Sequence, residues 1–149
     1  MEKNEITVNE PPSPQSSILV PQSSKKPTLV VTTRPNDANP DGDIFGGWLL
    51  SQIDIAGQIV ATKRAKGSVA TVAVKDMLFL QPLFVQDVVS FYCELAKVGK
   101  TSIAVSVKVY SDRKLGEGEK NVHVADATFI YVAIEKPGVK REVPAESLG

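Results

Sequence analysis

The sequence predicts an α+β fold in which a five- to six-stranded antiparallel sheet curves around one long central helix. Three observations lead to this prediction. Residues 44–66 form one long segment of helical character, and about five other segments have the composition of strands. The helical segment is apolar around most of its circumference, as expected of a helix buried on nearly all sides. One such helix among several strands favours a sheet wrapped around it.

The chain of 149 residues suits a single folded domain with a separate N-terminal segment. Half of its ten prolines lie within the first 27 residues, among serines and glutamines. Such a segment buries too little apolar surface to offset its ordering entropy, and it lacks the apolar run of a secretory signal. We expect a disordered tail at residues 1–26, a folded domain at 27–145 and a short C-terminal tail at 146–149.

Composition excludes several classes of function. Seventeen basic and seventeen acidic residues cancel, so there is no net field to attract nucleic acid or an anionic membrane. No stretch approaches the roughly 18–20 apolar residues of a transmembrane helix, so no stable membrane association is expected. The single cysteine, Cys93, cannot form a disulfide within the chain, which favours a reducing cytoplasm.

The first elements are a short strand and the long helix. The strand is expected at residues 29–31, and residues 34–42 after it have turn chemistry. The helix follows over roughly residues 44–66. Asp43 is well placed as its N-cap, because a carboxylate accepts hydrogen bonds from the free amides of a first turn. Gly67 is expected to close the helix.

Strands are expected in the rest of the chain at residues 69–80, 88–98, 101–110 and 122–134. The clearest is 101–110, where apolar residues alternate with small or polar ones in a period of two. Its apolar face consists of Ile103, Val105, Val107 and Val109. Residues 98–101 predict a tight hairpin, and the polar, glycine-containing residues 112–121 predict a loop.

A helical wheel divides residues 47–61 into two faces. The broad apolar arc, expected to pack against the sheet, comprises Trp48, Leu49, Ile53, Ile55, Ala56, Ile59 and Val60. The opposite stripe is small and polar, so a ligand or another backbone can approach it closely. It comprises Gly47, Ser51, Asp54, Gly57, Gln58 and Ala61.

Asp54 is the candidate catalytic residue of this stripe. Aspartate is a mediocre helix former, and Asp54 lies beyond the first turn, where the helix dipole would favour its charge. One interpretation is structural: a solvated carboxylate, or one bonded to Ser51 or Gln58 a turn away. The other is catalytic, because free amides at Gly46 and Gly47 can polarise a carbonyl while the carboxylate acts on it.

Residues 36–54, Asn-Asp-Ala-Asn-Pro-Asp-Gly-Asp-Ile-Phe-Gly-Gly-Trp-Leu-Leu-Ser-Gln-Ile-Asp, closely resemble the signature of the bacterial YciA-like acyl-CoA thioesterases. Blocks at residues 69–74, 79–82, 85–89 and 98–102 are similar to the same family, so the resemblance spans about residues 28–145. It implies a hotdog fold, an acyl-CoA substrate and active sites at the interface of a homodimer. It also implies that the two sheets join edge to edge and that three dimers commonly assemble into a hexamer.

The resemblance assigns the catalytic site. Asp54 matches the catalytic aspartate, acting on water as a general base or on the thioester as a nucleophile. Asp43 matches a polar position that is often asparagine in relatives, a role compatible with helix capping. The backbone amide of Gly47 is expected to bind the thioester carbonyl. One departure from the pattern is Gln86, which stands where relatives tend to have glycine.

The candidates for binding coenzyme A are Thr71, Val72, Gly99, Lys100, Thr101 and Ser102. The first two match residues that hold the pantetheine arm through backbone groups. The other four offer a cation, two hydroxyls and a glycine to the nucleotide, but they also suit an ordinary hairpin turn with a solvated lysine. Coenzyme A belongs to substrate and product, so no separate cofactor is expected, and no metal-ligand spacing is present.

Two other functions are compatible with a hotdog fold. A non-catalytic hotdog protein that binds acyl-CoA is the rival from a different functional class. Hotdog dehydratases use a histidine at the central helix, but residues 43–66 contain none. The single histidine, His123, is expected to be a strand residue without chemistry. Cys93 is expected to be a core thiol, and Asp126 is an unusual carboxylate inside the last strand.

Overall fold

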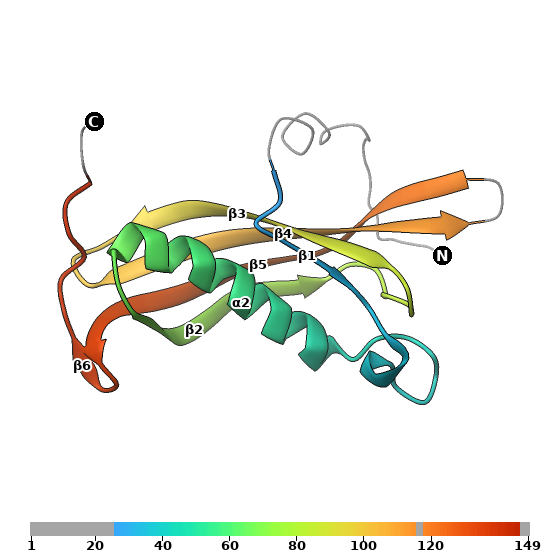
Figure 1. The fold of residues 1–149 in the computed structure, drawn as a ribbon, viewed down its shortest axis with the longest axis horizontal. Coiled ribbons are helices and arrows are strands. Elements are labelled where there is room, and N and C mark those ends of the chain that lie inside the picture. Colours follow the sequence, from blue (N-terminus) through green and yellow to red (C-terminus); the bar gives the residue numbers. More distant parts are fainter. Residues whose placement is uncertain (1–25, 116–117, 147–149) are drawn as a thin grey trace.

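The computed structural model describes residues 26–115 and 118–146, which form a six-stranded antiparallel sheet with one long helix across its inner face (Figure 1). The elements are β1 (Leu29–Thr32), the 3-10 helix η1 (Pro35–Asp37), α2 (Gly46–Ala65), β2 (Val69–Phe79), β3 (Val88–Val98), β4 (Ser102–Leu115), β5 (Gly118–Lys136) and β6 (Val139–Lys140). The strand order is β1-β3-β4-β5-β2, and β6 pairs with β5. The predicted α+β fold is confirmed, while residues 1–25 and 147–149 of the expected tails lie outside the described residues.

The core lies between α2 and the inner face of the sheet. The four alternating residues of β4 are fully buried, as predicted: Ile103, Val105, Val107 and Val109. From β5, Phe129 and Tyr131 join them beneath the helix. Burying an aliphatic or aromatic side chain of this size stabilises a fold by about 1.5–3 kcal/mol, so the alternation determines which side of β4 faces α2.

The buried face of α2 differs from the predicted one. Its buried residues are Leu49, Ile53, Ala56, Gly57, Ala61 and Ala65. Gly57 and Ala61 belong to the stripe expected to face away, whereas Ile55 and Ile59, expected against the sheet, are 46% and 37% exposed. The prediction is wrong for these four residues because small side chains let the helix backbone lie close to the sheet. Glycine inside a helix costs about 1 kcal/mol relative to alanine, so Gly57 carries a packing requirement.

Both predicted helix caps are wrong. α2 begins at Gly46 with Phe45 as its N-cap, because the preceding residues are extended and bonded to a distant loop. Asp43 forms an isolated bridge with Phe84, and the Ile44 amide donates to the Leu83 carbonyl at 2.8 Å. At the other end the left-handed residue is Lys66, one position before the expected Gly67.

The β4–β5 hairpin is longer than predicted. Residues 112–121 were expected to form a loop, but β4 continues to Leu115 and β5 starts at Gly118. Asp112 pairs with Asn121 across the ladder, and the Asn121 amide donates to the Asp112 carboxylate at 2.7 Å. Cross-strand pairing therefore overrides the turn preference of these polar residues. Figure 1 shows this hairpin extending beyond the body of the sheet.

β2 is an edge strand with two irregularities. Its register against β5 shifts by one residue between Thr71 and Ala73 and again between Lys75 and Leu78. Each shift is a β-bulge, which leaves one residue without a partner in the ladder. Asp76, inside the second bulge, has a left-handed φ of 52°. The free side of β2 carries no strand among the described residues.

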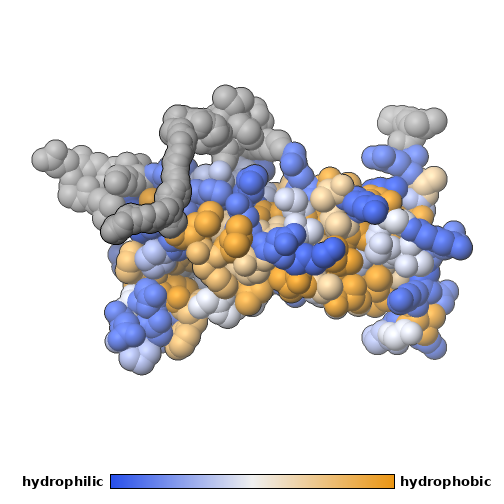
Figure 2. Space-filling model, turned by 180° about the vertical axis from the view of Figure 1, so that it is seen from behind, coloured by the Kyte–Doolittle hydropathy of each residue, from blue (hydrophilic) through white to orange (hydrophobic). Residues whose placement is uncertain are grey.

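The outer face of the sheet is mixed in character. Seen from behind, it shows hydrophobic patches separated by hydrophilic residues (Figure 2). Here Tyr110 stacks on His123 with ring centroids 4.7 Å apart, and His123 Nε2 lies 2.7 Å from Asp126 Oδ1. No helix in the described part of the chain is long and apolar enough to cross a membrane.

Candidate functional site

Asp54 is half-buried in the middle of α2, and its carboxylate is held by the neighbouring strand. The Thr71 hydroxyl of β2 donates to Asp54 Oδ1 at 2.6 Å. Under the structural interpretation, Asp54 could bond to Ser51 one turn earlier, but the Ser51 hydroxyl donates instead to the Trp48 carbonyl at 2.7 Å. The Thr71 hydroxyl therefore fixes one oxygen of the Asp54 carboxylate.

Tyr131 of β5 lies below the same turn of the helix. Its hydroxyl donates to the Asp54 backbone carbonyl at 2.9 Å. Burial, followed by the nearby negative charge of Asp54, raises the pKa of Tyr131 well above its usual value. The hydroxyl consequently stays protonated, and remains a donor, throughout the pH range in which proteins function.

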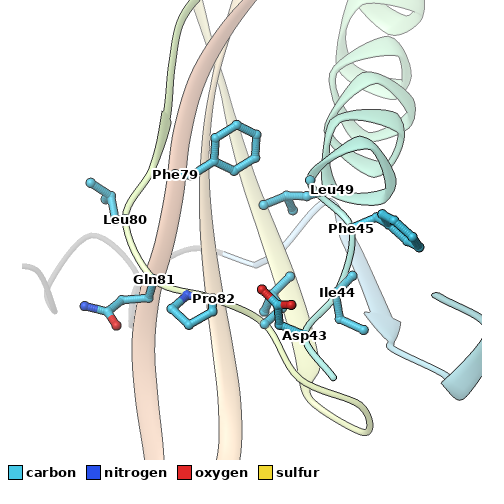
Figure 3. A pocket seen from close by; sticks show the side chains of 10 residues that line it. Asp43, Ile44, Phe45, Leu49, Phe79, Leu80, Gln81 and Pro82 are labelled. Atoms are coloured by element: carbon cyan, nitrogen blue, oxygen red, sulfur yellow. The ribbon is translucent and has the colours of Figure 1, made fainter. Parts of the chain in front are cut away.

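A pocket of about 330 Å³ lies at the start of α2, between the helix and the segment that follows β2. Its lining residues are Asp43, Ile44, Phe45, Gly46, Leu49, Phe79, Leu80, Gln81, Pro82 and Leu83. Figure 3 shows Phe79 and Leu49 pointing toward one another across it, with the Asp43 carboxylate near Pro82 and Phe45 turned away. The pocket thus has apolar walls and one acidic group at its edge.

Backbone donors are available beside this pocket. The amides of Trp48 and Leu49 bond to the Phe45 carbonyl, whereas those of Gly46 and Gly47 have no acceptor among the described residues. The space next to Gly47 is open, since a Cβ placed there would meet no atom within 4 Å. Free amides at a helix N-terminus attract negative charge, so they suit a developing oxyanion.

The segment that closes the pocket is anchored by a buried ion pair. Arg113 Nη2 lies 2.9 Å from Asp87 Oδ2, and the two side chains are 11% and 4% exposed. The same Asp87 oxygen accepts from the Phe84 amide at 3.0 Å, and Arg113 donates to the Pro82 carbonyl at 3.0 Å. Gln86 in this turn has a left-handed φ of 72°, which explains why a glycine suits that position.

The predicted site residues fall into three groups within one chain. Asp54 lies with Thr71, beside the exposed Val72. Asp43 and Gly46 line the pocket, and Gly47 follows them; Gly46 is eight residues before Asp54, or about 12 Å along an α-helix. The predicted nucleotide hairpin is at the opposite end of α2, where the Lys100 carbonyl accepts from the Val143 amide and Lys100 Nζ lies 3.7 Å from Glu142.

Cys93, His123 and Asp126 lie apart from this site. Cys93 points to the inner face opposite Val107, and burial raises the pKa of its thiol to about 11 despite a bond from Thr28 that lowers it. His123 and Asp126 pair on the outer face, away from Asp54. Among the described residues no group of three or more histidine, cysteine, aspartate or glutamate side chains is arranged to hold a metal ion.

Comparison with known proteins assigns the family. Residues 41–116 match the model of the thioesterase superfamily. The chain belongs to this superfamily. The acyl-CoA thioester hydrolase YciA of Salmonella typhimurium is 44% identical to this chain over 114 residues. The matched region covers 75% of this chain and 85% of that protein.

Solved structures confirm the hotdog fold for this member of the thioesterase superfamily. A hexameric hotdog fold thioesterase of Campylobacter jejuni has a TM-score of 0.78 and 37% identity, covering 80% of this chain and 91% of that one. HI0827, a hexameric broad specificity acyl-coenzyme A thioesterase studied as an aspartate-to-alanine mutant, has a TM-score of 0.77 and 39% identity, covering 81% and 88%.

A more distant structure reports on individual residues. The acyl-CoA hydrolase of Staphylococcus aureus, solved with butyryl coenzyme A and coenzyme A, has a TM-score of 0.68 and 26% identity, covering 78% of this chain and 70% of that one. Its solved mutants replace an asparagine, an aspartate fifteen residues later and a threonine seventeen residues after that.

Proposed function

We propose that this member of the thioesterase superfamily hydrolyses fatty acyl-CoA to free fatty acid and coenzyme A, with Asp54 as the catalytic carboxylate. The observation that carries this proposal is the Asp54–Thr71 hydrogen bond of 2.6 Å, which fixes a carboxylate in mid-helix beside an open sheet edge. The names of the relatives, acyl-CoA thioester hydrolases, supply the substrate class.

The spacing of residues supports this assignment and adds a candidate that the sequence analysis missed. Asn39, Asp54 and Thr71 are fifteen and seventeen residues apart, as are the three residues replaced in the S. aureus hydrolase. We therefore favour Asn39 over Asp43 as the polar residue that opposes Asp54. Asn39 lies in the loop before α2, where its side-chain oxygen accepts from the Asp41 amide at 2.9 Å.

The active site is completed by a second copy of the chain. Asp54 and the free amides of Gly46 and Gly47 are too far apart along one helix to act on one thioester. β2 has an unpaired edge, and several of its apolar side chains are exposed, which is unfavourable for an isolated chain. These residues are Val72, Val74, Leu78 and Phe79, each 45–55% exposed. Joining two β2 edges covers them and brings Asp54 of one protomer toward the pocket of its partner.

Assembly beyond the dimer follows the hexameric relatives. We propose a trimer of dimers, because the hexameric C. jejuni thioesterase and HI0827 share the fold with this chain at 37–39% identity. The expected partners are thus acyl-CoA and further copies of the chain, without nucleic acid, in the cytoplasm. Sedimentation at micromolar concentration tests the hexamer directly, and a monomer at that concentration contradicts the shared site.

The chemistry needs a base or nucleophile and an oxyanion site. The thioester carbonyl accepts from the free helix-start amides, and Asp54 either removes a proton from an attacking water or attacks the carbonyl carbon itself. In the first route the carbon–sulfur bond breaks and the proton passes to the leaving thiolate. In the second, attack by the Asp54 carboxylate breaks the carbon–sulfur bond and forms a mixed anhydride, and the released thiolate takes a proton from water. A further water molecule then hydrolyses the anhydride to the fatty acid and the free Asp54 carboxylate. Single-turnover hydrolysis in ¹⁸O-water separates the routes, since label in the Asp54 carboxylate requires the anhydride.

The protein offers a surface for each of the other parts of the substrate: the acyl chain, the pantetheine arm and the nucleotide. The apolar pocket lined by Leu49, Phe79 and Leu80 suits an acyl chain. Val72 is the extra residue of the first β2 bulge, so its backbone groups lack ladder partners on β5 and suit the pantetheine amides. Lys100 is exposed and offers a cation to the nucleotide phosphates. Lys100→Ala is expected to raise KM for acyl-CoA several-fold while kcat stays within twofold.

Catalysis and binding are separated by one pair of variants. Purified protein with palmitoyl-CoA and a thiol reagent is expected to release coenzyme A, and Asp54→Asn is expected to lower kcat by at least 100-fold. The Kd of this variant for coenzyme A, measured by calorimetry, should stay within a few-fold of the wild-type value. Glu135→Gln, which changes an exposed carboxylate on β5, serves as the control. Equal hydrolysis by wild type and Asp54→Asn contradicts the mechanism, and no hydrolysis by wild type favours the non-catalytic acyl-CoA-binding alternative.

A further inference from the structure

Asp54 is held by its main chain as well as by its side chain. Tyr131 is fully buried, and its hydroxyl reaches the Asp54 carbonyl oxygen from β5. In the β2–β5 ladder Tyr131 lies directly opposite Thr71, and both side chains point toward α2. Two cross-strand neighbours therefore hold one helical residue, Thr71 through the carboxylate and Tyr131 through the backbone.

Gly57 makes room for this contact. It lies one turn after Asp54 on the buried face of α2, where glycine weakens a helix relative to alanine. A Cβ on Gly57 would overlap the Tyr131 hydroxyl and lie 3.0 Å from Cζ and 3.1 Å from Cε2. The ring is packed below and cannot retreat without disturbing the core. Any side chain at Gly57 must therefore push this turn of α2 away from β5.

We propose that Tyr131 is a positioning residue for the thioesterase reaction, with Gly57 providing the space it needs. Together they determine the distance between the helix turn that carries Asp54 and the sheet. At that distance the carboxylate can bond to Thr71 and is oriented toward the thioester. This inference rests on the proposed function, because it assigns Tyr131 a role only if Asp54 performs the chemistry.

The proposal predicts a specific kinetic effect. Tyr131 is buried and does not line the pocket, so its loss is expected to leave substrate affinity unchanged. A carboxylate that is less well oriented slows the chemical step, because catalysis depends on ångström-scale placement. The expected signature is therefore a lower kcat with an unchanged KM.

The first test removes one oxygen atom. Tyr131→Phe is expected to lower kcat about 3- to 10-fold, the factor that corresponds to one net hydrogen bond, with KM within twofold. Tyr110→Phe is the matched control, since Tyr110 is 8% exposed and lies on the outer face of the sheet. A kcat for Tyr131→Phe within 1.5-fold of the control overturns the proposal, as does a change confined to KM.

The second test uses coupling between the two residues. Gly57→Ala is expected to lower kcat in the wild-type background, and to lower it by a smaller factor in the Tyr131→Phe background, where the overlapping oxygen is gone. Equal factors in both backgrounds contradict a shared role. If Gly57→Ala does not fold, the comparison of Tyr131→Phe with Tyr110→Phe still decides.

The Asp54→Asn assay keeps the two proposals distinguishable. Loss of hydrolysis in Asp54→Asn with normal kcat in Tyr131→Phe rejects the positioning role alone. Full hydrolysis by Asp54→Asn rejects the catalytic assignment itself, and the positioning role with it.

Discussion

Asp87→Asn should destabilise the protein far more than its position in a surface turn suggests. The replacement keeps the size of the side chain and its acceptor for the Phe84 amide, but it removes the charge that faces Arg113. Both side chains are almost completely buried, and one further Arg113 atom, Nε, is buried without a partner. Removing one member of a buried ion pair typically costs about 3–5 kcal/mol, because the other charge is left uncompensated.

The expected shift in melting temperature follows from this energy. We take about 3 kcal/mol, the lower end of the range, because the guanidinium also donates to the Pro82 carbonyl and lies 5.2 Å above the Phe84 ring. An unfolding entropy of about 2.1 cal/mol/K per residue over roughly 120 folded residues gives about 0.25 kcal/mol/K. Asp87→Asn is therefore expected to lower Tm by roughly 12 °C.

Thermal unfolding followed by circular dichroism at one fixed protein concentration measures this shift. Glu142→Gln is the control, because its pair with Lys100 is 70–79% exposed and exposed pairs are worth about 0–1 kcal/mol. A Tm loss in Asp87→Asn no larger than that of Glu142→Gln would refute the reasoning. Arg113→Met added to Asp87→Asn should restore part of the loss, since no charge then remains buried.

Three further predictions concern separate parts of the molecule. Gln86→Gly should raise Tm by a few degrees. The left-handed backbone of a non-glycine residue costs about 1–2 kcal/mol, which glycine avoids, and the greater entropy of glycine in the unfolded chain offsets only part of this gain. Asp126→Asn should lower Tm at pH 7. Burial raises the pKa of Asp126, but His123 and Lys108 together lower it more, so the net shift is downward. The ionised carboxylate therefore stabilises the folded protein above pH ~4, and this contribution is lost as the pH falls further. The difference in Tm between wild type and this variant should therefore shrink as the pH falls through the lowered pKa of Asp126. Cys93, with a pKa of about 11, should react with a disulfide reagent at pH 8 on the order of a hundredfold more slowly than in unfolded protein, as stopped-flow absorbance would show.

Elements that depend on local pattern were predictable from the sequence. The period of two in residues 101–110 identifies β4 and its buried face, because each strand residue alternates sides regardless of what lies next to it. The long helix was equally clear. Its caps were not, because Asp43 is engaged by Phe84, a residue 41 positions away. A capping preference cannot compete with a backbone bridge that the local sequence does not reveal.

The contacts around Asp54 could not be predicted from local sequence patterns either, because they also depend on long-range pairing. The sequence marks Asp54 as unusual, but its partner depends on the β2–β5 register, which brings Thr71 and Tyr131 together from 60 residues apart. The wheel placed Gly57 on the wrong face because it weighs side-chain hydrophobicity and not the space that a facing ring requires. Asn39 stands in a stretch so rich in turn residues that nothing local distinguishes it.

The two bulges of β2 keep its inward-facing residues in phase with β5. Thr71, Val74 and Phe79 lie opposite Tyr131, Phe129 and Ala125, which share one face of β5, although the intervals between them on β2 are three and five residues. An odd interval can leave both of its end residues on the same face only because each bulge holds one residue without a partner in the ladder. Removing the unpaired residue of either bulge should therefore keep Thr71 beside Asp54 and Phe79 at the pocket. An insertion or deletion in the regularly paired part would need a new bulge to do the same.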